Sequence, residues 1–333
     1  SSLRWDWKDF VHQNLSFYVQ PIETLVETQI EVPLPQVSPF APDDYRPLNP
    51  SIIRTDTGYL MVLRSVNYLQ EGGKEFITQD PEGKFRTRNF LLELDPHFTP
   101  LSQKEILESS GRKKNLGAKV EGLEDCRLID YEGSLWVSCT LSDMNPYLIP
   151  EMALCRIAED DKGAVSIQEL TLLHAFGEQR CEKNWLPFVR DGSLFFIYSF
   201  QPFIIVQPNL QDGRCSIVTQ QKLPWSLSHL RGSAPPIPFD RGWLLLTHEV
   251  LLQKNGKRAY LHRFVYLNQD YIVKRVTMKI IFKHIGVEIC CSMTWNHAGD
   301  SLIIPNGFED REARICSVSI AKIQEMLEDA SCL

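Results

Sequence analysis

The sequence lacks several features that would place it in familiar classes of protein. It contains no apolar run of 18 residues, so it predicts no membrane span. Its 35 basic and 42 acidic side chains give a net charge of −7, and we therefore expect no nucleic-acid partner. The chain starts without methionine or the pattern of a signal peptide, which suggests a trimmed chain or part of a longer polypeptide.

The nine cysteines also lack a functional spacing. None of them forms a CxxC pair or another metal-ligand pattern, so the sequence predicts no metal site. Most lie inside apolar, strand-like runs, where cysteine behaves as a small hydrophobic residue. A reducing, cytoplasmic compartment is the simpler interpretation of this usage.

What the sequence does contain is one hairpin pattern repeated five times. Each copy has a small or polar residue, an apolar run, a turn with glycine and a second apolar run. The turn glycines are Gly58, Gly133, Gly192, Gly242 and Gly299. Strand pairs that recur at intervals of about 60 residues are typical of propeller blades. The sequence therefore predicts an all-β fold, a five-bladed β-propeller covering residues 46–333.

The ends of the chain differ from this pattern. Six prolines between residues 31 and 50 exclude a helix or a central strand and imply an extended segment that wraps onto the first blade. We interpret residues 1–45 as an N-terminal extension of short helical or extended segments. Near the C-terminus, the spacing of Ile320, Ile323 and Leu327 predicts a short helix.

The repeat also predicts where a functional site would lie. In an antiparallel hairpin the first strand begins beside the end of the second, away from the turn. If the blades are radial, these strand ends meet at one mouth of the central channel. Such a ring of polar and charged groups is a candidate site, although each could be an ordinary strand-end residue. Its members, with close neighbours, are Asn49, Arg64, Asp125, Arg127, Lys183, Asn184, Tyr198, Arg231 and His248.

Three segments of this ring carry chemistry. Strand alternation would put Asp125 and Arg127 on one face and Glu124 on the other; the alternative is a salt bridge between blades. Trp185 could stack on a sugar or fill the core. A second acidic segment contains Asp310, and two well-separated carboxylates suit glycosyl transfer, unless this segment is a solvated loop.

The ordered motifs resemble those of a known family between about Asn49 and Ile320. The segment Glu124–Arg127 is similar to the Glu-Asp-Pro-Arg motif of glycoside hydrolase family 130, the five-bladed β-mannoside phosphorylases and related mannosyltransferases. Gly232–Ile237 and Gly242–Leu244 match the family's Pro-Pro-Ile and Gly-Trp-Leu strands. The chain departs from the family at Cys126, Thr247 and Glu249, and Glu249 adds a negative charge near any phosphate.

The resemblance implies an inverting glycoside phosphorylase or glycosyltransferase that acts on a mannoside-like sugar, with Asp125 as general acid/base. It implies no bound cofactor; inorganic phosphate, a sugar phosphate or a nucleotide sugar would be the co-substrate. By the resemblance, Arg127, Lys183 and His248 hold phosphate, and Asn49, Arg64 and Asp310 contact sugar. Their places near the mouth add Arg231 to the anion-binding set and Asn184, Trp185 and Tyr198 to the sugar-binding set.

Other functions fit the same residues. The chain could hydrolyse its substrate, or it could be a non-catalytic glycan- or protein-binding module of a larger glycan-assembly protein. A carbohydrate substrate is expected for the enzyme, and a homo-oligomer is compatible with the sequence.

Overall fold

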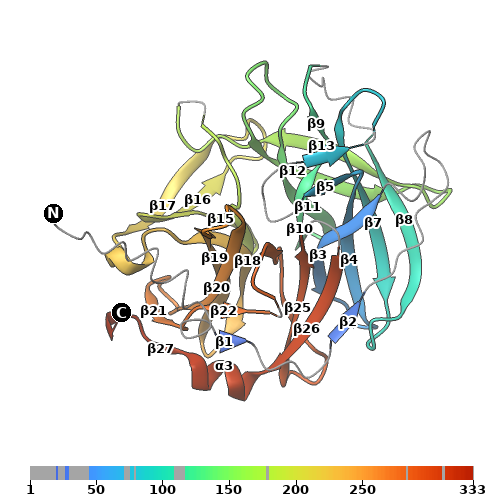
Figure 1. Cartoon of the computed structure of the whole chain (residues 1–333). Coiled ribbons are helices and arrows are strands. Elements are labelled where there is room, and N and C mark those ends of the chain that lie inside the picture. The colour runs from blue at the N-terminus through green and yellow to red at the C-terminus, as the bar shows by residue number, and fades with distance from the viewer. Residues whose placement is uncertain are drawn as a thin grey trace.

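The computed structural model describes residues 45–70, 76–78, 80–108, 117–177, 180–282, 284–309 and 312–332, with two short strands before them, β1 (Gln20–Pro21) and β2 (Glu27–Gln29). Strands form nearly all of the regular structure and surround a central axis (Figure 1). The α-helix α3 (Ile320–Met326) lies where the apolar spacing predicted a C-terminal helix. The all-β prediction is therefore confirmed.

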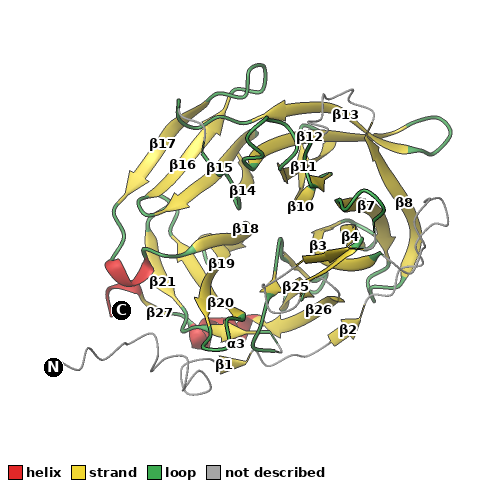
Figure 2. Cartoon of the chain, turned by 45° about the horizontal axis from the view of Figure 1, so that its top comes forward, coloured by secondary structure: helices red, strands yellow, loops and turns green. Residues whose placement is uncertain are grey.

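The strands run in antiparallel groups around the ring (Figure 2). The first group contains β3 (Arg46–Arg54), β4 (Tyr59–Val66), β7 (Phe85–Leu94) and β8 (Pro100–Glu108). The second contains β10 (Glu124–Tyr131), β11 (Ser134–Leu141), β12 (Glu151–Glu159) and β13 (Val165–Leu172). The third contains β14 (Leu186–Arg190), β15 (Ser193–Phe200), β16 (Phe203–Pro208) and β17 (Cys215–Gln221).

The fourth group contains β18 (Arg231–Phe239), β19 (Gly242–Leu252), β20 (Arg258–Leu267) and β21 (Val273–Val276), with β22 (Ile280–Ile281) beside β20. The last contains β25 (Ser301–Phe308) and β26 (Glu312–Ser319), with β23 (Glu288–Ile289) and β24 (Thr294–Trp295) beside β25. The remaining short elements are β5 (Tyr68–Gln70), β6 (Phe76–Thr78), β9 (Val120–Glu121), β27 (Glu328–Asp329) and the 3₁₀ turns η2 (Trp225–Leu227) and η3 (Ala330–Cys332).

Two features keep the groups from being five equal sheets. The first and second groups form one sheet, because β8 and β13 pair in parallel between Ile106–Glu108 and Val165–Ile167. In the last group, β23 and β24 are each only two residues long. The number of blades therefore stays a prediction at this point.

The five predicted hairpins are all present, as β3–β4, β10–β11, β14–β15, β18–β19 and β24–β25. Three of the turn glycines, Gly133, Gly192 and Gly299, have φ of 71°, 76° and 73°. Glycine is favoured there because other residues are strained in the left-handed region. Gly58 is needed for another reason, since a Cβ atom would lie 2.0 Å from the carbonyl oxygen of Leu94.

Apolar side chains fill the space between and within the groups. Cys126, Cys139 and Cys155 are buried in one cluster with Val137 and Ile157, as expected for cysteines that act as small hydrophobic residues. Among the described residues, no helix has the length and apolar character needed to cross a bilayer.

The N-terminal segment joins the sheets where it is described. Strand β2 pairs with β26, and β1 pairs in parallel with β22. The rest of residues 1–44, with the predicted helical stretch and the first four prolines of the proline-rich stretch, lies outside the described residues. The last two of these prolines, Pro47 and Pro50, lie in β3, which is at the end of its sheet order and so is not a central strand. The boundary between extension and propeller therefore stays a prediction.

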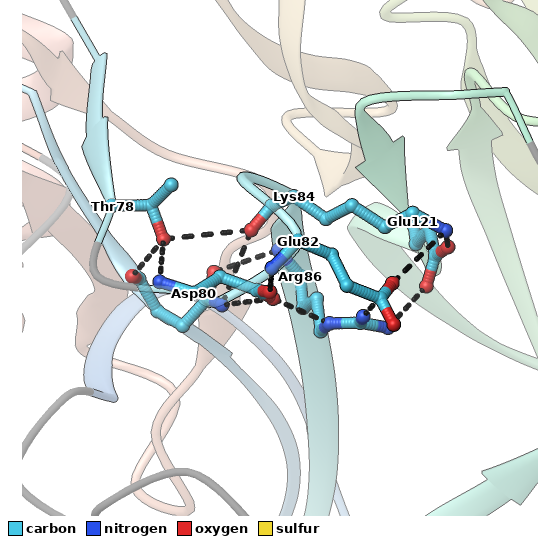
Figure 3. Close-up of polar contacts among 7 residues, drawn as sticks. Thr78, Asp80, Glu82, Lys84, Arg86 and Glu121 are labelled. Carbon is cyan, nitrogen blue, oxygen red and sulfur yellow. Dashed lines mark hydrogen bonds and ion pairs between the residues drawn. The ribbon is translucent and has the colours of Figure 1, made fainter.

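A network of ion pairs anchors the segment between β4 and β7 (Figure 3). The Arg86 guanidinium contacts the carboxylates of Asp80 at 2.6 Å, Glu121 at 2.7 Å and Glu82 at 3.0 Å, and Lys84 contacts Glu121 at 2.6 Å. Burial alone would raise the pKa of Asp80, but hydrogen bonds and the charge of Arg86 outweigh it and lower that pKa. The network holds β5 and β6 close to the end of β4 that carries Arg64.

Replacing Arg86 with methionine should lower the free energy of unfolding by about 3 kcal/mol near neutral pH, because it leaves the buried Asp80 carboxylate without its cation. Asp80 has a lowered pKa, so its contribution is present above the unfolded pKa of about 3.9 and is lost as the pH falls through the folded value. Urea unfolding at neutral pH and at about pH 3 measures the loss of stability and its dependence on pH.

Arg214→Met is the matched control, since that side chain is 84% exposed and lies 3.9 Å from Asp212. It should change stability by less than about 0.5 kcal/mol. Equal losses in the two variants would contradict a structural role for the network.

Candidate functional site

The predicted ring lies at the ends of the inner strands. Strands β3, β10, β14 and β18, each at an end of its sheet order, are the innermost of their groups in Figure 2. Across the first and fourth hairpins, Leu48 pairs with Arg64 and Arg231 with His248, at the ends away from the turns. The structure therefore brings residues from several strand groups to one end of the ring.

The same backbone conformation recurs in three consecutive hairpins. Asn49, Asp125 and Asn184 occupy equivalent positions and have φ of 44°, 49° and 61°. Asparagine and aspartate tolerate this left-handed conformation better than other non-glycine residues, which explains why these types recur. The repeated conformation turns short polar side chains toward their neighbours in the ring.

Asp125 is the centre of the contacts among these residues. Its Oδ1 atom accepts hydrogen bonds from Asn49 Nδ2 and from Arg64 Nη1, both at 2.9 Å. Arg64 is buried and also donates from Nε to Thr87 at 3.0 Å and from Nη2 to Tyr68 at 2.9 Å. The Asp125 side chain is 24% exposed, so its carboxylate is fixed but reaches the surface of the site.

The predicted alternation at this strand is wrong. The pairing of β10 with β11 shifts register between Glu124 and Arg127, where Asp125 has its positive φ. A bulge of this kind breaks the regular alternation of side chains. As a result, Glu124 Oε1 lies 3.5 Å from Arg64 Nη2, on the same guanidinium as Asp125. Glu124 is therefore a member of the site that the sequence analysis missed, although it is adjacent in the motif.

The two carboxyl groups have opposite pKa shifts. Burial would raise the pKa of Asp125, but the charges of Arg64 and Arg127 and the hydrogen bond from Asn49 outweigh it and place that pKa below its ordinary value. Burial raises the pKa of Glu124, and Arg64 and Lys183 only partly oppose it. Asp125 is thus ionised at neutral pH, while Glu124 retains its proton to a higher pH.

Arg127 is a buried connection between groups. Its exposed fraction is 1%; Nε donates to the carbonyl oxygen of Ser233 at 2.9 Å, and Nη2 donates to Asn184 Oδ1 at 3.4 Å. A guanidinium buried in this way does not reach a phosphate in this conformation. The structure shows Arg127 as a link between the second, third and fourth groups, and its predicted phosphate contact stays a prediction.

His248 is buried as well, and its predicted phosphate contact also stays a prediction. Its Nδ1 atom lies 2.7 Å from Ser233 Oγ, and its ring stacks on Tyr260 with a centroid separation of 5.3 Å. Burial, followed by the charges of Arg231 and Arg127, lowers the pKa of His248 to about 3. The ring is neutral, so it does not supply the positive charge expected of a phosphate-binding residue.

The two accessible cations of the predicted set are Lys183 and Arg231. Both are exposed and line a cavity of about 410 Å³ between the third and fourth groups, together with Asn184, Tyr198 and Gly232. We call this the cation-lined cavity. It is the place where the structure could receive an anionic part of a ligand.

Glu182 links the two aromatic residues of the predicted sugar set. Its carboxylate accepts from the Trp185 indole N–H and from the Tyr198 hydroxyl, each at 3.0 Å. Burial and then the charge of Glu182 raise the pKa of Tyr198 to about 12. Trp185 is completely buried and packs against Phe196, so it fills the core and its ring is not available to stack on a sugar.

Two other expectations concern acidic residues. Asp310 lies outside the described residues. Glu249 is buried with three basic neighbours, His229 at 2.5 Å, Lys279 at 3.4 Å and Arg263 at 4.0 Å. Burial would raise the pKa of Glu249, but these partners lower it. Its negative charge is therefore locally compensated, which the isolated sequence position did not suggest.

No protein-family model matches the chain. The chain is 42% identical to Beta-mannosyltransferase 2 of Komagataella phaffii over 155 residues, which cover 40% of the chain. It is 26% identical to Beta-mannosyltransferase 3 of the same organism over 161 residues, which cover 42% of the chain. These matches cover 24% and 26% of the two relatives, so the chain spans about a quarter of their length.

Solved structures share the fold over most of the chain. A β-1,2-mannobiose phosphorylase from Listeria innocua, in complex with β-1,2-mannobiose, has a TM-score of 0.57 at 14% identity and covers 91% of this chain and 99% of its own. MPT-1, a GDP-Man-dependent mannosyltransferase from Leishmania mexicana, has a TM-score of 0.52 at 12% identity over 83% and 86% of the two chains. The chain therefore has a propeller-type fold, a divergent form of the one implied by the resemblance to glycoside hydrolase family 130.

The neutral state of buried His248 can be tested through stability. Since its folded pKa is about 3, the unfolded state binds more protons between that value and the unfolded pKa of about 6.5, and stability falls as the medium is acidified. In His248→Asn, the free energy of unfolding should fall less steeply on acidification, by about 1.4 kcal/mol for each pH unit below about 6. Urea unfolding across this range measures the slope.

His97→Asn is the control, because His97 is exposed on the turn after β7. It should leave the slope unchanged. If His248→Asn keeps the wild-type slope, the buried ring is not neutral.

Proposed function

We propose that this chain is an inverting glycosyltransferase that moves a mannosyl residue from a phosphate-activated donor to a hydroxyl group of a mannoside acceptor. The observation that carries the proposal is that Asp125, held by Asn49 and Arg64, is connected through Arg127 to Asn184, which lines the cavity with two exposed cations. The mannosyltransferase and mannobiose phosphorylase relatives support mannose as the sugar. We also infer that the five strand groups act as five blades, whose inner strands surround the site.

In the proposed step, the acceptor oxygen forms a bond to the anomeric carbon and its proton passes to Asp125. The bond between that carbon and the phosphate oxygen breaks, and the electron pair leaves with the phosphate. Lys183 and Arg231 would stabilise the leaving charge. A phosphate leaving group needs little protonation, so the step requires a base more than an acid.

This role differs from the general acid that a phosphorylase needs. In phosphorolysis the carboxyl must carry a proton to the departing sugar oxygen. The lowered pKa of Asp125 opposes that state at neutral pH. A phosphate-activated sugar such as GDP-mannose is therefore favoured as the mannosyl donor over a mannoside that is cleaved by inorganic phosphate.

Replacing Asp125 with asparagine should lower the rate of mannosyl transfer at saturating donor and acceptor by about 10²- to 10⁴-fold, because the amide cannot accept the proton. Transfer from GDP-mannose to a mannoside, followed by chromatography of the product, measures this rate. Asp130→Asn is the matched control on the same strand, since Asp130 is exposed. Unchanged transfer in Asp125→Asn would overturn the assignment of the base.

The cations should act mainly on the donor. Lys183→Gln and Arg231→Gln should each weaken donor binding by about tenfold, as expected for the loss of one charge-assisted contact, while the affinity for a neutral mannoside stays the same. Calorimetric titration with GDP-mannose and with methyl mannoside separates the two. Lys162→Gln, at the turn between β12 and β13, is the matched control. Equal weakening of both ligands would place these cations outside the donor site.

A further inference from the structure

A second cavity lies next to the site and is unused by the proposed transfer step. It has a volume of about 370 Å³ and is lined by Glu151, Phe176, Arg180 and Glu182, among others. We call it the carboxylate-lined cavity. The segment 180–184 separates it from the cation-lined cavity, because Arg180 and Glu182 face one side while Lys183 and Asn184 face the other.

Short contacts connect both walls of this cavity to the site that contains Asp125 and Glu124. On one side, Glu182 is two residues from Asn184, about 7 Å of extended chain, and Asn184 contacts Arg127. On the other side, Ser142 Oγ lies 3.4 Å from Glu124, and Asn145 Nδ2 donates to Glu151 at 3.1 Å. The Glu182 N–H also donates to the Pro150 carbonyl at 2.9 Å, which ties the two walls together.

The lining offers a ring face and hydrogen-bonding groups together. The Phe176 ring is partly exposed, meets Tyr198 edge-on at 5.0 Å and lies 5.6 Å from the Arg180 guanidinium. Carboxylates accept hydrogen bonds from hydroxyl groups, a guanidinium donates to their oxygens, and an aromatic face packs against apolar C–H surface. A pyranose complements all three, because it has hydroxyl hydrogens to donate, oxygens to accept and apolar C–H faces to pack.

Formal charge separates the two cavities. Two carboxylates and one guanidinium line the second cavity, whereas the described lining of the cation-lined cavity contains Lys183 and Arg231 and no acid. A phosphate-bearing ligand is therefore favoured in the cation-lined cavity and disfavoured in its neighbour.

We propose that the carboxylate-lined cavity binds the distal sugars of the acceptor, a neutral chain of hexopyranose units, while the first acceptor sugar lies at Asp125. The proposal rests on the proposed transfer function, which supplies an acceptor. Binding of distal sugars in this cavity gives the enzyme a preference for oligosaccharide acceptors over monosaccharides, because only a longer chain reaches past Glu182.

The test compares methyl mannoside, mannobiose and mannotriose as ligands of the Phe176→Leu and Glu151→Gln variants. The wild type should bind mannotriose more tightly than methyl mannoside. Each variant should weaken mannotriose binding by about three- to tenfold, the loss expected for one ring contact or one hydrogen bond. Methyl mannoside and GDP-mannose should bind as in the wild type. Glu169→Gln, on the exposed face of β13, is the matched control and should change nothing.

Three results would overturn the proposal. Mannotriose could bind no better than the monosaccharide in the wild type, or both variants could bind it as the wild type does. The variants could instead weaken GDP-mannose alone, which would make the cavity a nucleoside site. Melting temperatures of the variants within about 2 °C of the wild type would show that the effects are local.

Calorimetric binding without turnover keeps this proposal distinct from the transfer function. If mannotriose binds in the cavity and the variants weaken it, but no donor supports transfer, the proposed function fails and the cavity assignment holds. If Asp125→Asn abolishes transfer while the cavity variants bind mannotriose normally, the cavity assignment fails alone.

Discussion

The site depends on one guanidinium that touches two carboxyl groups. Arg64 is buried, is held by Thr87 and Tyr68, and contacts both Asp125 and Glu124. Its charge keeps Asp125 ionised despite burial, whereas Glu124, at a longer distance and more buried, has a raised pKa. Asp80, a member of the ion network, also accepts a hydrogen bond from Asn67, the residue before Tyr68, so the network is connected to the segment that holds Arg64.

The hairpin repeat was readable from the sequence because turn glycines and alternating apolar runs are local signals. Counting from the glycines also located the ring, including Asn49, Asp125 and Asn184, whose type reflects a left-handed backbone. The spacing of the turn glycines could not reveal that β8 pairs with β13, or how short β23 and β24 are. Such features depend on contacts between distant segments.

The side-chain roles were less predictable. The bulge at Asp125 reversed the face expected for Glu124, and a bulge is not visible in an alternating pattern. The sequence did not show that the side chains of His248 and Arg127 are buried, and a basic residue type does not guarantee an accessible positive charge. Lys183 and Arg231 remained exposed, so the positive charge available to a ligand is concentrated in the cation-lined cavity.

The most direct test of this account is the pKa of Asp125 in the folded protein. With carboxyl-¹³C-labelled aspartate, the signal missing in Asp125→Asn can be followed by NMR as the pH is lowered. The account predicts a midpoint below the ordinary value of about 3.9 in the wild type and an upward shift in Arg64→Gln. A midpoint near or above neutral pH in the wild type would contradict it, because Asp125 would then be an acid and the phosphorylase direction would be favoured.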